Sequence, residues 1–218
     1  MLNKENIFAK KDDVADFIKE NLSISAQMLN KCIEKGINSS DLTRCNRYLY
    51  YKYISGIPYK MEQIVKEAVV KKWGKIFSVN KLFDIVTTSY ACADIKYNIV
   101  GTIDLIVKII DNPRKPLAVM FKRKNAEDIN DGKISRKDIV EIMANMWMAE
   151  IADGILIYEN EQDTNIEVFH VVPDTYLINS IKSTCKDIFT VVKKIPDRPY
   201  GNVSEECEKC YFKEFCWK

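Results

Sequence analysis

The sequence is poor in histidine and lacks long apolar runs. His170 is the only histidine, and it lies in an apolar strand pattern where an imidazole more often serves packing or surface contacts than metal binding. No run of 18 apolar residues occurs, which excludes a hydrophobic membrane-spanning helix. The first residues soon turn charged and build no signal-peptide core. We therefore expect a cytoplasmic protein, in a prokaryotic cell or a virus-infected host cell, with no membrane partner.

An excess of charge of one sign is also missing. The 33 basic and 31 acidic residues leave a net charge of +2, so the overall charge does not point to a nucleic-acid partner. Basic residues do gather locally, in two groups: Lys66, Lys71, Lys72 and Lys75, and then Lys122, Arg123, Lys124, Lys133, Arg136 and Lys137. Each group could follow nucleic-acid phosphates or form a solvated face, and charge alone leaves both readings open.

The seven cysteines, with no leader to direct export, favour thiols over disulfides. Three of them lie inside apolar helix or strand patterns and are expected in the core: Cys32, Cys92 and Cys185. The tail carries a different pattern, in which Cys207 and Cys210 are separated by two residues and Cys216 follows after five more. Two-residue spacing lets a tight turn aim both thiolates at one metal centre.

A four-coordinate centre needs one more ligand, and the tail offers no other cysteine or histidine. Cys45 is the best candidate, because its surroundings are polar and helical. We therefore predict a metal centre held by Cys45, Cys207, Cys210 and Cys216. Spacing does not separate zinc from iron–sulfur, and unligated thiols are a third reading.

The hydrophobic periodicity predicts helices first and a mixed α/β region afterwards. Helices are expected over residues 12–19, 25–36, 41–55, 61–75, 137–152 and 173–194, and strands over 83–90, 97–110, 116–122, 155–158 and 166–172. This order predicts an α+β fold, a mixed sheet flanked by helices. We expect three parts: a helical region over 1–75, a core over 76–194 and a cysteine segment over 195–218.

The pattern Cys45-Asn46-Arg47, followed far downstream by the three tail cysteines, resembles the CRISPR-associated RecB-like exonucleases, the family of the fourth Cas protein, and their relatives. The resemblance covers about residues 45–216. It implies an iron–sulfur cluster on the four cysteines, most often of the 4Fe-4S form, with zinc as the alternative. It also implies a PD-(D/E)XK restriction-endonuclease-like core that binds DNA.

In that family, two carboxylates hold Mg²⁺ or Mn²⁺ beside a lysine. Gly101-Thr102-Ile103-Asp104 resembles the strand of the first carboxylate, which implies Asp104 as a metal ligand. Lys122 fits the catalytic lysine, but Met120 stands where the second acid should be. Alternate strand residues share a face, so Met120 projects beside Lys122, and a thioether is a poor ligand for a hard cation. We therefore expect no efficient Mg²⁺ or Mn²⁺ site.

Two further departures point the same way. The family's histidine–glutamate pair aligns with Lys66-Glu67, and its glutamine and tyrosine appear as Glu141 and Asn145. We expect Asp104 to pair with Lys66 or Lys122 in place of a metal, although Glu141 could replace the missing ligand.

We predict a nuclease-derived protein with lost or weak cleavage that binds single-stranded DNA or DNA ends, or scaffolds a DNA-processing complex. The residues expected along the nucleic acid are Lys66, Arg123, Lys124, Arg136, Lys137, Glu141 and Asn145. One alternative is an active Mg- or Mn-dependent exonuclease or endonuclease with a rearranged site. Another is a protein-interaction module of a larger assembly, docking through residues 1–40.

Overall fold

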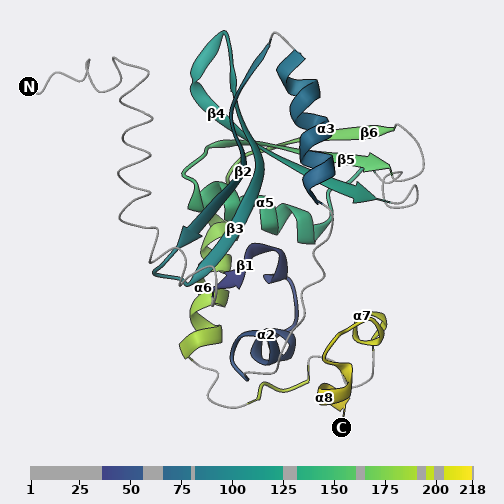
Figure 1. Ribbon diagram of the computed structural model, residues 1–218. Coiled ribbons are helices and arrows are strands. Elements are labelled where there is room, and N and C mark those ends of the chain that lie inside the picture. The colour runs from purple at the N-terminus through teal and green to yellow at the C-terminus, as the bar shows by residue number, and fades with distance from the viewer. Residues whose placement is uncertain are drawn as a thin grey trace, which may run out of the picture.

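The computed structural model describes residues 36–55, 66–79, 82–124, 132–160, 165–190, 195–198 and 204–217. Its helices are η1 (Ser39–Asp41, a 3₁₀ turn), α2 (Asn46–Tyr53), α3 (Lys66–Val79), α5 (Arg136–Met148), α6 (Thr175–Thr190), α7 (Glu205–Glu208) and α8 (Lys213–Trp217). Its strands are β1 (Ile37–Asn38), β2 (Phe83–Asp94), β3 (Ile99–Ile109), β4 (Asn112–Lys124), β5 (Asp153–Asn160) and β6 (Ile166–Val171) (Figure 1).

The six described strands form one mixed sheet. Strands β2, β3 and β4 form an antiparallel meander, and β1 adds a short parallel pairing to the start of β3. Helix α5 then carries the chain across to β5, which pairs parallel with β4, and β6 returns antiparallel to β5. The predicted α+β class and the mixed sheet flanked by helices are confirmed.

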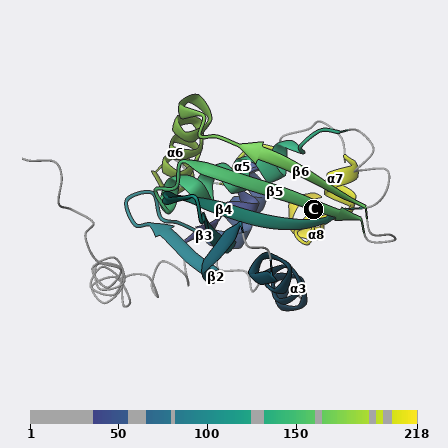
Figure 2. The same ribbon diagram turned by 90° about the horizontal axis from the view of Figure 1, so that it is seen from above.

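Helices cover both faces of the sheet (Figure 2). On one face, α3 buries Val70, Trp73 and Phe77 against strands β3 to β5. The indole of Trp73 stacks on the ring of Phe121, with 5.2 Å between their centroids. On the other face, α5 and α6 enclose the larger core, which includes Met120. Strands β4 and β5 are buried on both sides, which explains their nearly continuous apolar runs.

A small lobe made of α2, α7 and α8 lies below the sheet in Figure 1. Phe212 is its anchor: it is 1% exposed, and its ring meets those of Tyr48 and Tyr51 at centroid distances of 5.3 and 5.7 Å. The Tyr51 hydroxyl donates to the carbonyl of Phe215 at 3.0 Å. Aromatic packing therefore joins the tail to a helix more than 150 residues earlier in the sequence.

The observed boundaries differ from the expected ones in several places. The helix expected from residue 41 is split, because Cys45 has an extended backbone and caps α2 by accepting the Tyr48 N–H. The strand expected from residue 116 begins at Asn112, directly after a turn at 110–111. The helices expected over 12–19 and 25–36 fall outside the described residues, except for residue 36. The division into three parts stays a prediction, and α3 runs across its boundary at residue 75.

None of the described helices is long and apolar enough to cross a membrane.

Candidate functional site

Asp104 and Met120 lie side by side at the centre of the sheet. Leu105 pairs with Val119 across β3 and β4, and continuing this antiparallel register by one residue sets Asp104 opposite Met120. Asp104 is buried and accepts the Phe121 N–H at 2.8 Å, and Met120 is wholly buried. The Asp104 carboxylate therefore bonds to the backbone of β4 directly after Met120, and the side chain at position 120 offers no oxygen.

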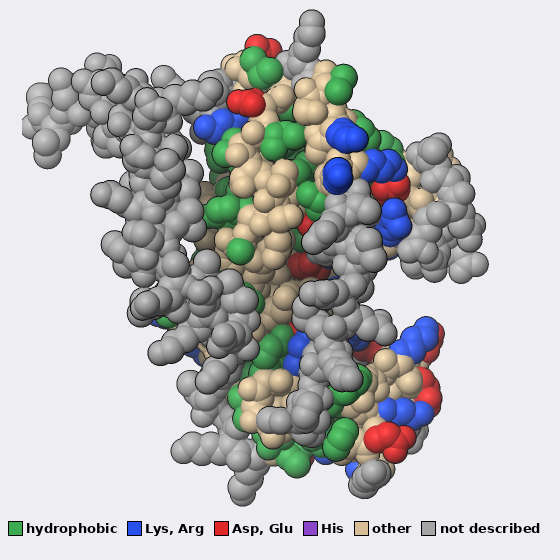
Figure 3. All heavy atoms as spheres, in the orientation of Figure 1, with side chains coloured by type: hydrophobic (Ala, Val, Ile, Leu, Met, Phe, Trp, Pro, Cys, Tyr) green, Lys and Arg blue, Asp and Glu red, His purple; other side chains and the backbone are tan. Residues whose placement is uncertain are grey.

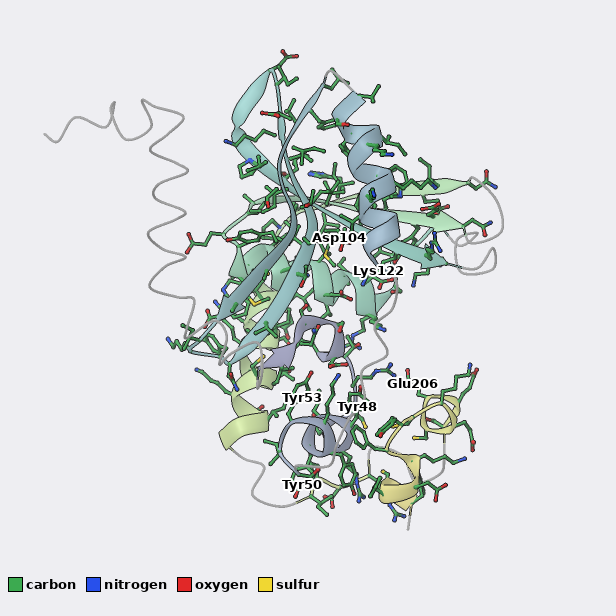
Figure 4. All side chains as sticks on the ribbon, viewed as in Figure 1. Tyr48, Tyr50, Tyr53, Asp104, Lys122 and Glu206 are labelled. Atoms are coloured by element: carbon green, nitrogen blue, oxygen red, sulfur yellow. The ribbon has the colours of Figure 1, made fainter. Side chains whose placement is uncertain are left out.

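Lys122 lies on the same face as Met120, two residues further along β4 (Figure 4). Its ammonium contacts the carboxylate of Glu141 at 2.6 Å and that of Asp138 at 4.0 Å. Both acids come from α5 and are almost fully buried. Lys122 thus acts as the counter-ion of two buried carboxylates. Whether Asp104 also pairs with Lys122 or with Lys66 stays a prediction, and the Lys66 side chain is not described.

Asp138 was not among the predicted site residues, yet its carboxylate bonds to Lys124, Ser135 and Tyr158. Burial alone would raise its pKa, but hydrogen bonds from Lys124, Ser135 and Tyr158 outweigh burial and hold the pKa below its ordinary value. Lys124 contacts it at 2.7 Å and the Tyr158 hydroxyl at 2.8 Å. Burial in turn raises the pKa of Tyr158 to about 12. A Ser-x-x-Asp helix-start pattern at Ser135 was the sequence signal that could have found it.

Asn145 fills the space beside Met120. Its amide donates to the Thr102 carbonyl at 3.0 Å and to the Met120 sulfur at 3.4 Å. A Cβ atom added to Gly101 would come within 1.9 Å of the Asn145 side-chain oxygen and 2.7 Å of the Ser39 hydroxyl. Gly101 therefore admits α5 and η1 to close contact with β3, and Asn145 is a packing residue as well as a polar one.

The basic residues predicted to follow a nucleic acid separate into two groups. Lys122 and Lys124 are engaged in internal ion pairs. Arg123, Arg136 and Lys137 are exposed near the same end of β4 and α5. Further Lys and Arg side chains gather beside α3 on the face seen in Figure 3, where Lys71, Lys72 and Lys75 are exposed. Lys122 and Lys124 are therefore neutralised inside the site, and Lys72, although exposed, pairs with Glu159 of β5.

The four predicted metal-binding cysteines line a single pocket in the small lobe: Cys45, Cys207, Cys210 and Cys216. The cavity between them has a volume of about 20 Å³. Among the described residues, no three His, Cys, Asp or Glu side chains are grouped so as to hold a metal ion. The cysteines thus share one pocket without being drawn together into a ligand set.

Two of these thiols already accept hydrogen bonds. The Ser204 hydroxyl donates to Cys207 at 3.3 Å and lowers the pKa of that thiol, and the Tyr48 N–H donates to Cys45 at 3.5 Å. Burial raises the pKa of Cys210 and of Cys216, and charge on Cys45 or Cys207 raises it further. The four sulfurs therefore lie within electrostatic reach of one another.

The other described cysteines behave differently. Cys92 and Cys185 are buried in the core, as expected, and burial raises the pKa of each thiol to about 12. His170 is exposed on β6, where its Nε2 lies 3.1 Å from Asp153. None of these three residues lines the cysteine pocket.

No protein-family model matches the sequence, and no curated protein matches it. Solved structures do match the fold. The crystal structure of SSO0001 is 17% identical, with a TM-score of 0.55, and the match covers 88% of this chain and 95% of that one.

Two exonucleases are also similar. The alkaline exonuclease LHK-Exo from Laribacter hongkongensis is 11% identical, with a TM-score of 0.56 over 72% of this chain and 87% of its own. It has also been solved in complex with dAMP. A phage-related exonuclease from Haemophilus somnus 129PT is 11% identical, with a TM-score of 0.51 over 70% of this chain and 91% of its own. The chain therefore shares its fold with these exonucleases.

Proposed function

We propose that this chain is a RecB-like nuclease-fold protein that binds DNA, or scaffolds a DNA-processing complex, and has lost efficient cleavage. We further propose that its four pocket cysteines hold an iron–sulfur cluster, as in the CRISPR-associated exonucleases that the sequence resembles.

The proposed loss of cleavage rests on one observation: Met120, a wholly buried thioether, stands two residues before Lys122 on β4, where a second carboxylate is expected. Two-carboxylate sites bind Mg²⁺ through hard anionic oxygens, and here one oxygen donor is replaced by a buried thioether. The lysine that would orient the attacking water is tied to Glu141 at 2.6 Å. A divalent ion would have to displace an internal ion pair and would still lack its second acid.

DNA binding is supported by the fold and by the exposed cations. The structural neighbours include two exonucleases, one of them solved with dAMP. Arg123 near the end of β4 and Arg136 and Lys137 at the start of α5 are exposed cations available to phosphates. Binding through such contacts weakens steeply as salt rises, because phosphate neutralisation releases counterions.

A cleavage assay and a metal-binding assay test the lost activity together. Labelled single-stranded DNA incubated with wild-type protein and Mn²⁺ should stay intact. The variant Met120→Glu should gain thermal stabilisation by Mn²⁺, about 2.7 kcal/mol at a hundredfold excess over Kd, and wild type should gain none. The double variant Met120→Glu with Asp104→Asn is the matched control and should lose the effect. Digestion by wild type that disappears in Asp104→Asn would establish the alternative, an active nuclease using Glu141.

A gel-shift assay at low and high salt tests the DNA contact. Wild type should bind a single-stranded or end-containing probe at low salt and release it at high salt. The triple variant Arg123→Gln, Arg136→Gln and Lys137→Gln should bind weakly throughout. If wild type binds no DNA at low salt, the chain is better explained as a protein-interaction module.

Two observations besides the cysteine pattern support the proposed cluster. All four thiols line one cavity, and two buried N–H donors near it lack an acceptor. When bound, a cluster would join the tail to α2 through iron–thiolate bonds and could accept an electron. The test is iron and sulfide content with absorbance in the visible range, compared with Cys210→Ala. A colourless protein that contains zinc would establish the alternative metal.

A further inference from the structure

Three buried side-chain polar atoms of the described residues have no hydrogen-bond partner: Glu167 Oε2, Arg47 Nε and Trp217 Nε1. The last two are N–H donors that belong to the cysteine lobe. Leaving a buried donor without an acceptor costs about 1–3 kcal/mol, so two such donors at one place call for an acceptor. Sulfur atoms of a bound cluster would supply it.

Arg47 lies in the first turn of α2, two residues after Cys45. Its Nη2 donates to the Tyr51 hydroxyl at 3.2 Å, and Tyr51 is itself fixed by its bond to the Phe215 carbonyl. The guanidinium is therefore held in one orientation. Tyr51 lines the pocket, so the guanidinium lies next to the pocket wall, within electrostatic reach of Cys216 and Cys45.

Trp217 lines the pocket directly, from the end of α8. Its indole N–H lies near enough to Cys207 to stabilise the thiolate, yet it meets no acceptor at hydrogen-bonding geometry. The guanidinium of Arg198 lies over the indole, 4.8 Å from the ring centroid, and helps to fix its plane. Trp217 thus contributes to the cavity wall an indole whose N–H has no acceptor.

We propose that Arg47 and Trp217 donate N–H hydrogen bonds to the sulfur atoms of the cysteine-bound cluster and raise its reduction potential. Hydrogen bonds to sulfur and a nearby fixed positive charge both favour the more negatively charged, reduced form. The two residues are positioning and tuning residues, because they act through the sulfurs and bind no metal themselves. The proposal rests on the proposed cofactor.

Redox titration of the full chain tests it. The variants Trp217→Phe, which keeps an aromatic ring but removes the donor, and Arg47→Gln should each lower the equilibrium constant for reduction about tenfold, which is about 59 mV for a one-electron couple. Lys209→Gln is the control. It removes the same charge from the same lobe, but that side chain is 79% exposed and its charge is screened.

The outcomes separate the two proposals. If wild type contains no iron and sulfide, the proposed cofactor is wrong and this inference falls with it. If wild type holds a cluster and both variants keep it with an unchanged potential, the tuning role alone is wrong. Circular dichroism identifies a variant that unfolds. Arg47→Lys, which keeps the charge, should then shift the potential less than Arg47→Gln, and equal potentials would count against the role of the charge.

Discussion

Replacing Lys122 by methionine removes the positive charge from the site and keeps the length of the side chain. Lys122 is 15% exposed and contacts Glu141, which is 5% exposed, at 2.6 Å. Two unit charges 4 Å apart attract by about 4 kcal/mol at an effective dielectric of 20. Removing one partner of a buried pair leaves the other uncompensated and costs about 3–5 kcal/mol. Because Lys122 retains some contact with water, we expect a loss of about 3 kcal/mol in the free energy of unfolding.

Urea denaturation at neutral pH measures this loss. Arg123→Met is the matched control, since Arg123 is the next residue on β4 and is exposed, and it should cost at most about 0.5 kcal/mol. Adding Glu141→Gln to Lys122→Met should restore more than half of the lost stability, because it removes the buried carboxylate charge that Lys122→Met leaves without a counter-ion. A cost below about 1 kcal/mol for Lys122→Met, or no recovery in the double variant, would refute the view that Lys122 is an internal counter-ion.

Three further changes probe the frame around the two sites. Gly101→Ala should lower thermal stability by about 1–3 kcal/mol, since its Cβ would lie 1.9 Å from the Asn145 oxygen; calorimetry that finds no change would show that α5 can shift away. The folded pKa of Asp138 is held below its ordinary 3.8, so its ion pair contributes fully above that pH and is lost as pH falls through the folded value. Urea denaturation between pH 2 and 6 should therefore show an acid-side loss that is smaller in Asp138→Asn, and parallel curves would argue against the Lys124 pair. Phe212→Ala should cost about 3–5 kcal/mol and release the tail to protease, whereas a protected tail would mean that other contacts anchor it.

The fold could be predicted because hydrophobic patterns along the sequence reflect burial in the folded chain. The strands around Asp104 and Met120 were recognisable because alternating and continuous apolar runs reflect burial on one or two faces. The helix expected over 137–152 was close to the observed α5, Arg136–Met148, because its apolar residues recur with the helical period. Boundaries were less predictable. Cys45 was placed inside a helix, and it caps one, because a thiol that accepts an N–H has no clear sequence signature.

The partners of the charged residues could not be predicted. Lys124 was assigned to a nucleic acid, but its ammonium pairs with the buried carboxylate of Asp138 on α5. Which acid a lysine of β4 contacts depends on how α5 is placed along the strand. That placement is set by tertiary packing. The sequence therefore identified the candidate residues of the site without the connections among them.

The sequence by itself determined the mixed sheet, the missing acid at Met120 and the cysteine pattern, because each depends on residue type and spacing along the chain. The tertiary structure decided which side chains contact one another. It set Lys122 against Glu141, brought Cys45 to the same pocket as the tail cysteines and left Arg47 and Trp217 with buried donors beside it. Such contacts join residues far apart in sequence, and their geometry is fixed only when the helices have packed onto the sheet.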